Sequence, residues 1–285
     1  MSQKAPKISL VIPVYNEEDH LADCLTAVCA QQVPFSEIIV IDNNSTDDTA
    51  AIASLFPGIT LLHESKQGVI HARTAGFNHA SGDIIARIDA DTLLPTDWTR
   101  QLMTIFSDQS IAAVSGKVTY YDMAAGKLFN YVDLFFRRYF AKVLGREVAL
   151  QAANMAIRKT VWRTIKHDIC KVGGMHEDFD LAIHTNWAGH TVKFDERLVA
   201  GIGYRQAEAG FKDFCTYACL SPKTYRSHGL RSARYMYPVV GLAIICYGVL
   251  KLLHRGYDPE AHKFSVVRAF TVNSAIRVNP ATFVD

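Results

Sequence analysis

The N-terminal part of the chain alternates short apolar runs with segments of helical character, and this alternation restricts the fold more than any other feature. Strands are expected at residues 8–14, 37–41, 59–63 and 84–88, and helices at residues 16–30, 43–55 and 68–80. Near-continuous apolar runs of this length are typical of parallel strands that are buried on both faces. Three strand–helix repeats therefore predict a mostly parallel, Rossmann-like sheet with right-handed crossovers.

The second half of the chain is less regular. A strand is expected at residues 111–118, helices at residues 127–144 and 177–188, a short strand at residues 191–194 and a helical tail from about residue 207. A chain of 285 residues can hold one large domain, or a domain with an appendage. We predict an α/β domain over residues 1–205, with helices flanking its central sheet, and a helical C-terminal extension over residues 206–285.

Charge is distributed unevenly, although the formal net charge is only +2. A nearly neutral chain gives no electrostatic reason to expect nucleic acid as a partner. Residues 214–257 contain no Asp or Glu, and they hold six cations: Lys223, Arg226, Arg231, Arg234, Lys251 and Arg255. A surface of one sign suits contact with an anionic membrane surface, a diphosphate, or both.

The cysteines and the N-terminus both favour a cytoplasmic protein. The six cysteines include no C-x-x-C pair and no cluster that completes a zinc site, so reduced thiols are expected. The short polar segment before residue 8 leads directly into a strand and does not resemble a signal peptide.

Residues 235–250 form an apolar stretch without a charged side chain, whose role the sequence leaves open. As a helix this stretch would extend about 24 Å, which is short of the ~30 Å hydrocarbon core of a bilayer. Three alternatives remain: a helix that is buried or forms a dimer, an interfacial or re-entrant helix, and a true membrane span.

Two carboxylates, Asp89 and Asp91, follow the expected strand at residues 84–88. Carboxylates at the end of a buried strand are unfavourable unless a cation lies between them. Mg²⁺ and Mn²⁺ prefer such hard oxygen ligands and leave positions open for a substrate. A D-x-D pair is a weak signal alone, so its weight depends on the segments before it.

Polar side chains also follow two other strands, where ligands of parallel sheets bind. Tyr15 follows the first strand and Asp42 the second. Asp42 fits either a turn-forming residue or a group that accepts a hydrogen bond from a base. Arg73 lies on the third helix, where exposure or a salt bridge is the ordinary role and a diphosphate clamp the functional one.

Two further groups have an ordinary and a functional interpretation. Glu177 and Asp178 open a helix, where acidic residues are common, but a carboxylate there also suits a general base. Arg226, His228 and Arg231 form either a solvated face or a cationic group that meets a leaving diphosphate.

Taken together, the segments resemble a family 2 glycosyltransferase of the GT-A fold. The matching stretches are residues 9–17 (SLVIPVYNE), 39–47 (IVIDNNSTD), Gly68 with residues 72–76 (ARTAG), 80–83 (ASGD), 89–91 (DAD), 173–174 (GG) and 177–181 (EDFDL). Each stretch is weak alone, but the set in this order is specific. The resemblance covers roughly residues 8–200 and fades beyond residue 205.

The resemblance implies a role for each matching residue. Pro13, Tyr15 and Glu17 would line the nucleotide pocket, and Asp42 would accept from the base. Asp91 would be the direct ligand of Mg²⁺ or Mn²⁺, and Asp89 would hold the ribose or a metal-bound water. Arg73 would lie near the diphosphate. Asp178 would be the catalytic base, with Glu177 as the alternative. Asn43-Asn44 departs from the commoner Asp-Gly or Asn-Gly, which keeps a turn but removes its glycine.

The resemblance implies an inverting, metal-dependent transfer of sugar from a nucleotide-diphosphate sugar, with UDP-sugars favoured, to a hydroxyl acceptor. The basic and apolar C-terminal part favours a lipid-linked or envelope glycan acceptor, and a soluble acceptor stays open. Peripheral contact with the cytoplasmic face of a membrane and a homodimer are also left open as partners. Two alternatives stay open. A sugar-phosphate nucleotidyltransferase should carry a Gly-rich loop with an Arg after the first strand, where PVYNEE stands here. A non-catalytic nucleotide-sugar-binding protein would share the fold.

Overall fold

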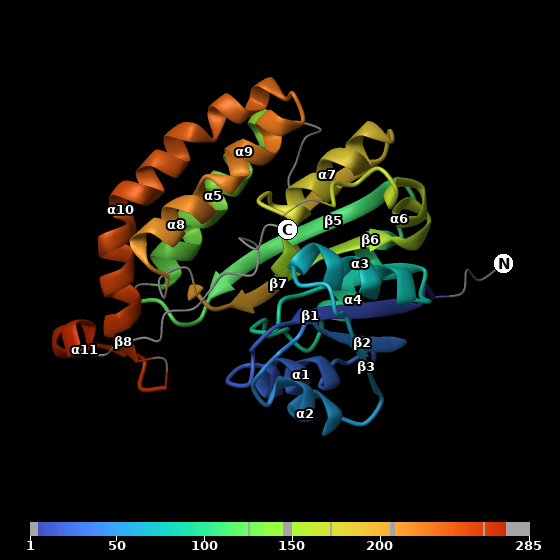
Figure 1. Cartoon of the computed structure of the whole chain (residues 1–285), viewed down its shortest axis with the longest axis horizontal. Helices are drawn as coiled ribbons and strands as arrows, with labels where there is room; N and C mark the ends of the chain where they lie inside the picture. The colour runs from blue at the N-terminus through green and yellow to red at the C-terminus, as the bar shows by residue number, and fades with distance from the viewer. Residues whose placement is uncertain are drawn as a thin grey trace. The chain divides into compact units, whose positions relative to one another are not determined.

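The computed structural model describes residues 5–124, 126–144, 150–171, 173–205, 209–258 and 260–271. The chain divides into two compact units (Figure 1). Unit 1 comprises residues 1–118, 146–171 and 177–201, and unit 2 comprises residues 119–145, 172–176 and 202–285. The predicted domain boundary at residue 205 stays a prediction.

Unit 1 is built on a seven-stranded sheet, from which only the last residues of two strands pass into unit 2. Its strands are β1 (Ile8–Val14), β2 (Glu37–Asp42), β3 (Ile59–His63), β4 (Ile84–Arg87), β5 (Ile111–Tyr120), β6 (Met155–Arg158) and β7 (Thr191–Ile202). Their order is β3-β2-β1-β4-β6-β5-β7. The pairs β1–β2, β1–β4 and β2–β3 are parallel, and β6 runs antiparallel to β4 and β5. The predicted mostly parallel sheet is confirmed.

Helices cover both faces of this sheet because successive strand residues point to opposite sides. On one face, Leu10 and Ile12 of β1 share a buried cluster with α1 (Leu21–Cys29), α2 (Thr49–Ser54) and α4 (Trp98–Phe106). On the other face, Val11 shares a cluster with α3 (Val69–His79), α6 (Lys159–Ile165) and α7 (Glu177–Trp187) (Figure 1). The resulting helix–sheet–helix arrangement confirms the α/β class.

Asn154, in a short 3₁₀ turn (Ala152–Asn154), ties three elements of unit 1 together. Its side-chain amide donates to the carbonyls of Lys117 in β5 (2.8 Å) and Leu198 in β7 (2.9 Å). Its Oδ1 accepts from the indole N–H of Trp98 in α4 at 3.0 Å. Gly116 lies against this group, where a Cβ would overlap the carbonyl oxygen of Leu198 and the amide of Asn154.

We expect Gly116→Ala to destabilise unit 1 by about 3 kcal/mol, because neither the backbone carbonyl nor the bonded amide can move away. Urea unfolding should show a lower midpoint with an unchanged slope. Gly241→Ala is the control, because a Cβ at Gly241 meets nothing within 4 Å. Equal midpoints for the two variants would show that the contact around Gly116 yields more easily than the structure implies.

Unit 2 is mainly helical. Its elements are α5 (Gly126–Leu144), α8 (Phe211–Ala218), α9 (Leu220–Ser227), a 3₁₀ turn (Arg231–Tyr235), α10 (Tyr237–Gly256), β8 (Tyr257–Asp258), β9 (Lys263–Phe264) and α11 (Val266–Thr271). The predicted helical C-terminal region is confirmed. Among the described residues, Arg231–Gly256 form one stretch that is long and apolar enough to cross a membrane, and an 18-residue window within it has a mean hydropathy of 1.9. The core helix of a soluble protein can meet the same criteria.

Candidate functional site

Unit 1 brings the loops after β1 and β2 together at the carboxyl ends of these strands. The two strands pair in register, with Val14 opposite Asp42. The backbone N–H of Asn16 donates to Ser45 Oγ (3.1 Å), and the N–H of Thr46 donates to Asn16 Oδ1 (2.8 Å). The N–H of Glu17 donates to Thr49 Oγ1 at 2.7 Å. The segment with Pro13, Tyr15 and Glu17 is thus fixed beside Asp42.

Asp42 is buried and holds the turn that follows β2. Its Oδ1 accepts from the N–H of Ser45 at 3.2 Å, and its Oδ2 lies 3.4 Å from Nδ1 of His63. Asn44 adopts a positive φ of 65°, so an asparagine takes the left-handed position that a glycine would otherwise fill. The expected turn is confirmed, and contact of Asp42 with a base stays a prediction.

The acidic pair lies on a tight turn after β4. The N–H of Asp89 donates to Thr92 Oγ1 (3.2 Å), and the N–H of Thr92 donates back to the carbonyl of Asp89 (3.1 Å). Asp91 is buried, whereas the side chain of Asp89 is 44% exposed. Two carboxylates held on one turn provide hard oxygen donors, which fit Mg²⁺ or Mn²⁺. The metal-binding roles of both residues stay predictions.

Glu177, the first residue of α7, lies between two buried arginines. Arg73 Nη1 donates to Glu177 Oε2 at 2.9 Å and to the carbonyl oxygen of Glu177 at 2.7 Å. Arg87 Nη1 donates to Oε1 of the same carboxylate. A salt bridge was one of the roles expected for Arg73, and it is confirmed. Contact of Arg73 with a diphosphate stays a prediction.

Arg87 was missed from the sequence, although a lone charge in the apolar run of residues 84–88 was a usable signal. Its guanidinium binds Glu177 and also lies 3.6 Å from Oδ1 of Asp89. Burial alone would lower the pKa of Arg87, but Glu177 and Asp89 together raise it. One buried cation thus links the start of α7 to the acidic turn after β4.

Asp178 follows Glu177 and is only 9% exposed. Burial, with a further contribution from the neighbouring charge of Glu177, raises the pKa of Asp178 to about 7. Its Oδ2 accepts from the N–H of Ala152 (3.0 Å) and its Oδ1 from the N–H of Phe179 (2.9 Å), which opposes the shift. A fixed carboxyl group with a pKa near neutrality has the properties of a general acid or base.

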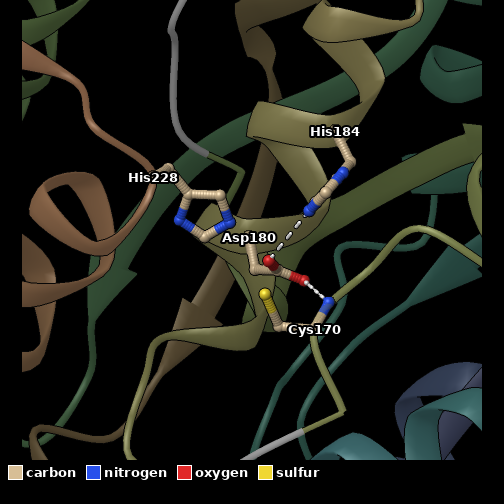
Figure 2. Close-up of side chains that lie close together, drawn as sticks. All are labelled: Cys170, Asp180, His184 and His228. Carbon is tan, nitrogen blue, oxygen red and sulfur yellow. Dashed lines mark hydrogen bonds and ion pairs between the residues drawn. The ribbon is translucent and has the colours of Figure 1, made fainter.

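Cys170 lies beside Asp180 and His184, which are one turn apart on α7. Figure 2 shows the side chains of these three residues directed toward one another. Asp180 Oδ2 accepts from the backbone N–H of Cys170 at 3.1 Å, and Oδ1 lies 3.4 Å from Nε2 of His184. Burial and Asp180 raise the pKa of the Cys170 thiol to about 12. We interpret these contacts of Asp180 as structural, because they fix the loop around residue 170 to α7.

Arg226, His228 and Arg231 belong to unit 2. Arg226 and Arg231 are exposed, and Nδ1 of His228 lies 2.7 Å from the carbonyl oxygen of Thr224. Their contact with a diphosphate stays a prediction.

Comparison with known proteins agrees with the arrangement of unit 1. Residues 9–164, just over half of the chain, match the family model described as Glycosyl transferase family 2. The chain is 29% identical over 168 residues to the glycosyltransferase AglE of Haloferax volcanii, covering 56% of this chain and 55% of AglE. It is 35% identical over 111 residues to an undecaprenyl-phosphate 4-deoxy-4-formamido-L-arabinose transferase of Sodalis glossinidius, covering 36% and 34% of the two chains. The chain thus spans about half or less of the length of these relatives.

Solved structures show the same fold at low sequence identity. The mannosyltransferase PcManGT of Pyrobaculum calidifontis, in complex with GDP-Man and Mn²⁺, matches with a TM-score of 0.61 and 18% identity, covering 94% of this chain and 74% of that one. Glucosyl-3-phosphoglycerate synthase of Mycobacterium tuberculosis, in complex with Mn²⁺, UDP-Glc and phosphoglyceric acid, matches with a TM-score of 0.55 and 17% identity, covering 79% and 80%. The GT-A fold is confirmed, and the chain belongs to glycosyl transferase family 2.

Proposed function

We propose that this protein is an inverting glycosyltransferase, which moves a sugar from a nucleotide-diphosphate sugar to a hydroxyl acceptor. The observation that carries the proposal is the charge arrangement of unit 1. Arg87 binds Glu177 and also contacts Asp89 of the acidic turn, while Asp178, next to Glu177, has a pKa raised to about 7. Arg87 thus connects the start of α7, which carries the proposed base Asp178, to the turn that carries the proposed metal ligands Asp89 and Asp91.

The donor would lie at the carboxyl ends of β1, β2 and β4. Pro13, Tyr15 and Glu17 would line the nucleotide, and Asp42 would accept from its base, which favours a base with an imino N–H such as uracil. Asp91 would be the direct ligand of Mg²⁺ or Mn²⁺, with Asp89 on the ribose or on a metal-bound water. When bound, the cation would neutralise negative charge on the leaving diphosphate. The relatives solved with GDP-Man or UDP-Glc and Mn²⁺ support this donor class.

Asp178 would perform the proton transfer. Its carboxylate takes the proton of the acceptor hydroxyl while that oxygen attacks the anomeric carbon of the donor sugar. The bond from this carbon to the diphosphate oxygen breaks on the opposite face, so the configuration inverts. Arg73 and Arg87 hold Glu177, and the backbone N–H groups of Ala152 and Phe179 orient the carboxylate of Asp178.

A lipid-linked or envelope glycan is the proposed acceptor, used at the cytoplasmic face of a membrane. The name of the Sodalis relative refers to undecaprenyl phosphate, a lipid carrier. The absence of Asp and Glu from residues 214–257 suits an anionic surface.

Calorimetric titration with UDP, GDP and their common sugar conjugates, with and without Mn²⁺, tests the donor site. We expect one nucleotide to bind in a metal-dependent manner. Asp91→Ala should lower its affinity in Mn²⁺ by at least about 10–100-fold, because losing a residue that only supports a metal ligand already has this effect. Asp97→Ala, a more exposed acidic residue in the following segment, should bind normally. Unchanged affinity of Asp91→Ala in Mn²⁺ contradicts the metal assignment.

A further inference from the structure

We propose that unit 2 docks on an anionic lipid surface through one face of α10, with the helix lying in the plane of the interface. The inference deepens the proposed transfer to a lipid-linked acceptor and rests on it.

The outward face of α10 is apolar along most of its length. Leu242, Ile245, Val249 and Leu252 are 49%, 81%, 62% and 37% exposed. Their spacing of three, four and three residues places them on one side of a helix. No charged residue interrupts the helix until Lys251. Val266, Val267 and Phe270 of α11, which packs against α10, are also exposed and apolar.

The opposite face of α10 is attached to the rest of unit 2. Tyr247 donates its hydroxyl hydrogen to the carbonyl of Ala209, and Lys251 Nζ donates to the same oxygen at 2.9 Å. The ring of Tyr247 stacks on Phe214 of α8 with centroids 4.4 Å apart. Leu250 and Leu253 pack on a cluster around Met123 and Tyr204.

These attachments argue against a membrane span. A helix crossing the bilayer would carry α8 with it, together with Lys212 and Asp213, which are both exposed. Charged side chains are unfavourable in the hydrocarbon region. A helix with one attached face and one apolar face fits the interface instead.

The charges around this face favour anionic lipid over a second copy of the chain. Arg231 and Arg234, both exposed, precede the helix, and Tyr235 and Tyr237 lie at its start, where aromatic side chains suit the headgroup level. A symmetric dimer through α10 would bring two such basic surfaces together, which is repulsive. Lipid phosphates attract them.

Flotation with vesicles tests the proposal directly. The full chain should float with vesicles of mixed phosphatidylcholine and phosphatidylglycerol, bind pure phosphatidylcholine weakly, and dissociate in high salt or alkaline carbonate. Ile245→Glu combined with Val249→Glu should reduce vesicle binding about tenfold or more, because both side chains would have to be withdrawn from the lipid. The matched control is Leu55→Glu, at a 79% exposed leucine that directly follows α2 in unit 1, and this variant should bind like the unaltered chain.

Four results overturn the docking proposal: no vesicle binding by the unaltered chain, equal loss in the control, protein that resists carbonate extraction, and a lipid-free dimer that the double variant converts to a monomer. The third would indicate a span, and the last a dimer interface. Donor titration of the same proteins without vesicles separates the two claims. A chain that binds a nucleotide sugar but no vesicle refutes only the docking surface, whereas a chain that binds vesicles but no donor refutes the proposed function.

Discussion

Replacing Asp178 with Asn is expected to lower kcat about 10²–10⁴-fold, the usual effect of removing a general base. Asparagine keeps the shape of the side chain and can still accept from the N–H of Ala152 or Phe179, so the fold and the donor site should persist. Binding of the nucleotide sugar, measured by calorimetry, should stay close to that of the unaltered chain. The loss should therefore appear in the transfer step alone.

The raised pKa of Asp178 adds a pH dependence to this prediction. A base acts only when it is deprotonated, so kcat/KM of the unaltered chain should rise as the pH increases through about 7. Stability should change in the opposite direction. Because the pKa of Asp178 in the folded chain exceeds the 3.8 of an ordinary aspartate, folding takes up a proton at pH values between 3.8 and about 7, and stability falls as the pH rises through this window.

Asp178→Asn removes this penalty. The variant should be more stable than the unaltered chain at pH 8, by at most about 4 kcal/mol, and the difference should vanish as the pH falls toward 4. A variant that is more stable but nearly inactive would identify Asp178 as a group held for catalysis. Near-normal turnover of Asp178→Asn would contradict that role and transfer the role of base to Glu177.

Replacing Arg87 with Met is expected to destabilise unit 1 by about 3–5 kcal/mol, because the buried carboxylate of Glu177 loses one cationic partner and keeps another, Arg73. Methionine occupies much of the same volume, so the loss should come mainly from charge. Urea unfolding measures it. The control is Arg100→Met, whose side chain is 57% exposed and pairs with Asp97 at 3.4 Å, and which should change stability by less than about 1 kcal/mol.

A double variant separates charge from packing in this prediction. If Arg87 acts through Glu177, then Arg87→Met combined with Glu177→Gln should be less destabilised than the sum of the two single changes. Strict additivity, or a loss no larger than that of Arg100→Met, would show that the buried ion pair does not hold the start of α7.

The strands of unit 1 were predictable from the sequence because each is an apolar run bounded by polar turn residues. β3 (Ile59–His63) was expected at the bounds observed, and the expected strand at residues 84–88 differs from β4 by one residue. β6 (Met155–Arg158) was not predicted, because four residues in an antiparallel position carry no periodic signal. β7 was expected over residues 191–194 but continues to Ile202, since its polar residues after Phe194 conceal the strand.

The candidate site was only partly predictable. Asp42, Asp89 and Asp91 were placed correctly at strand ends, because the repeat pattern determines where strands finish. The partners of Glu177 could not be found in this way, since Arg73 and Arg87 are 104 and 90 residues away along the chain. The contacts of Asp180 with Cys170 and His184 likewise depend on how the loop around residue 170 packs against α7, and the local sequence pattern does not determine this packing.

The most direct test of the proposed function is a transfer assay with labelled nucleotide-diphosphate sugars, Mn²⁺ and a membrane lipid extract, run in parallel with the unaltered chain and Asp178→Asn. We predict that the unaltered chain consumes one donor and attaches its sugar to an acceptor with inverted anomeric configuration, and that the variant binds this donor without transferring the sugar. If the unaltered chain consumes none of the donors, it is not the proposed glycosyltransferase. If both proteins transfer sugar equally, Asp178 is not the catalytic base.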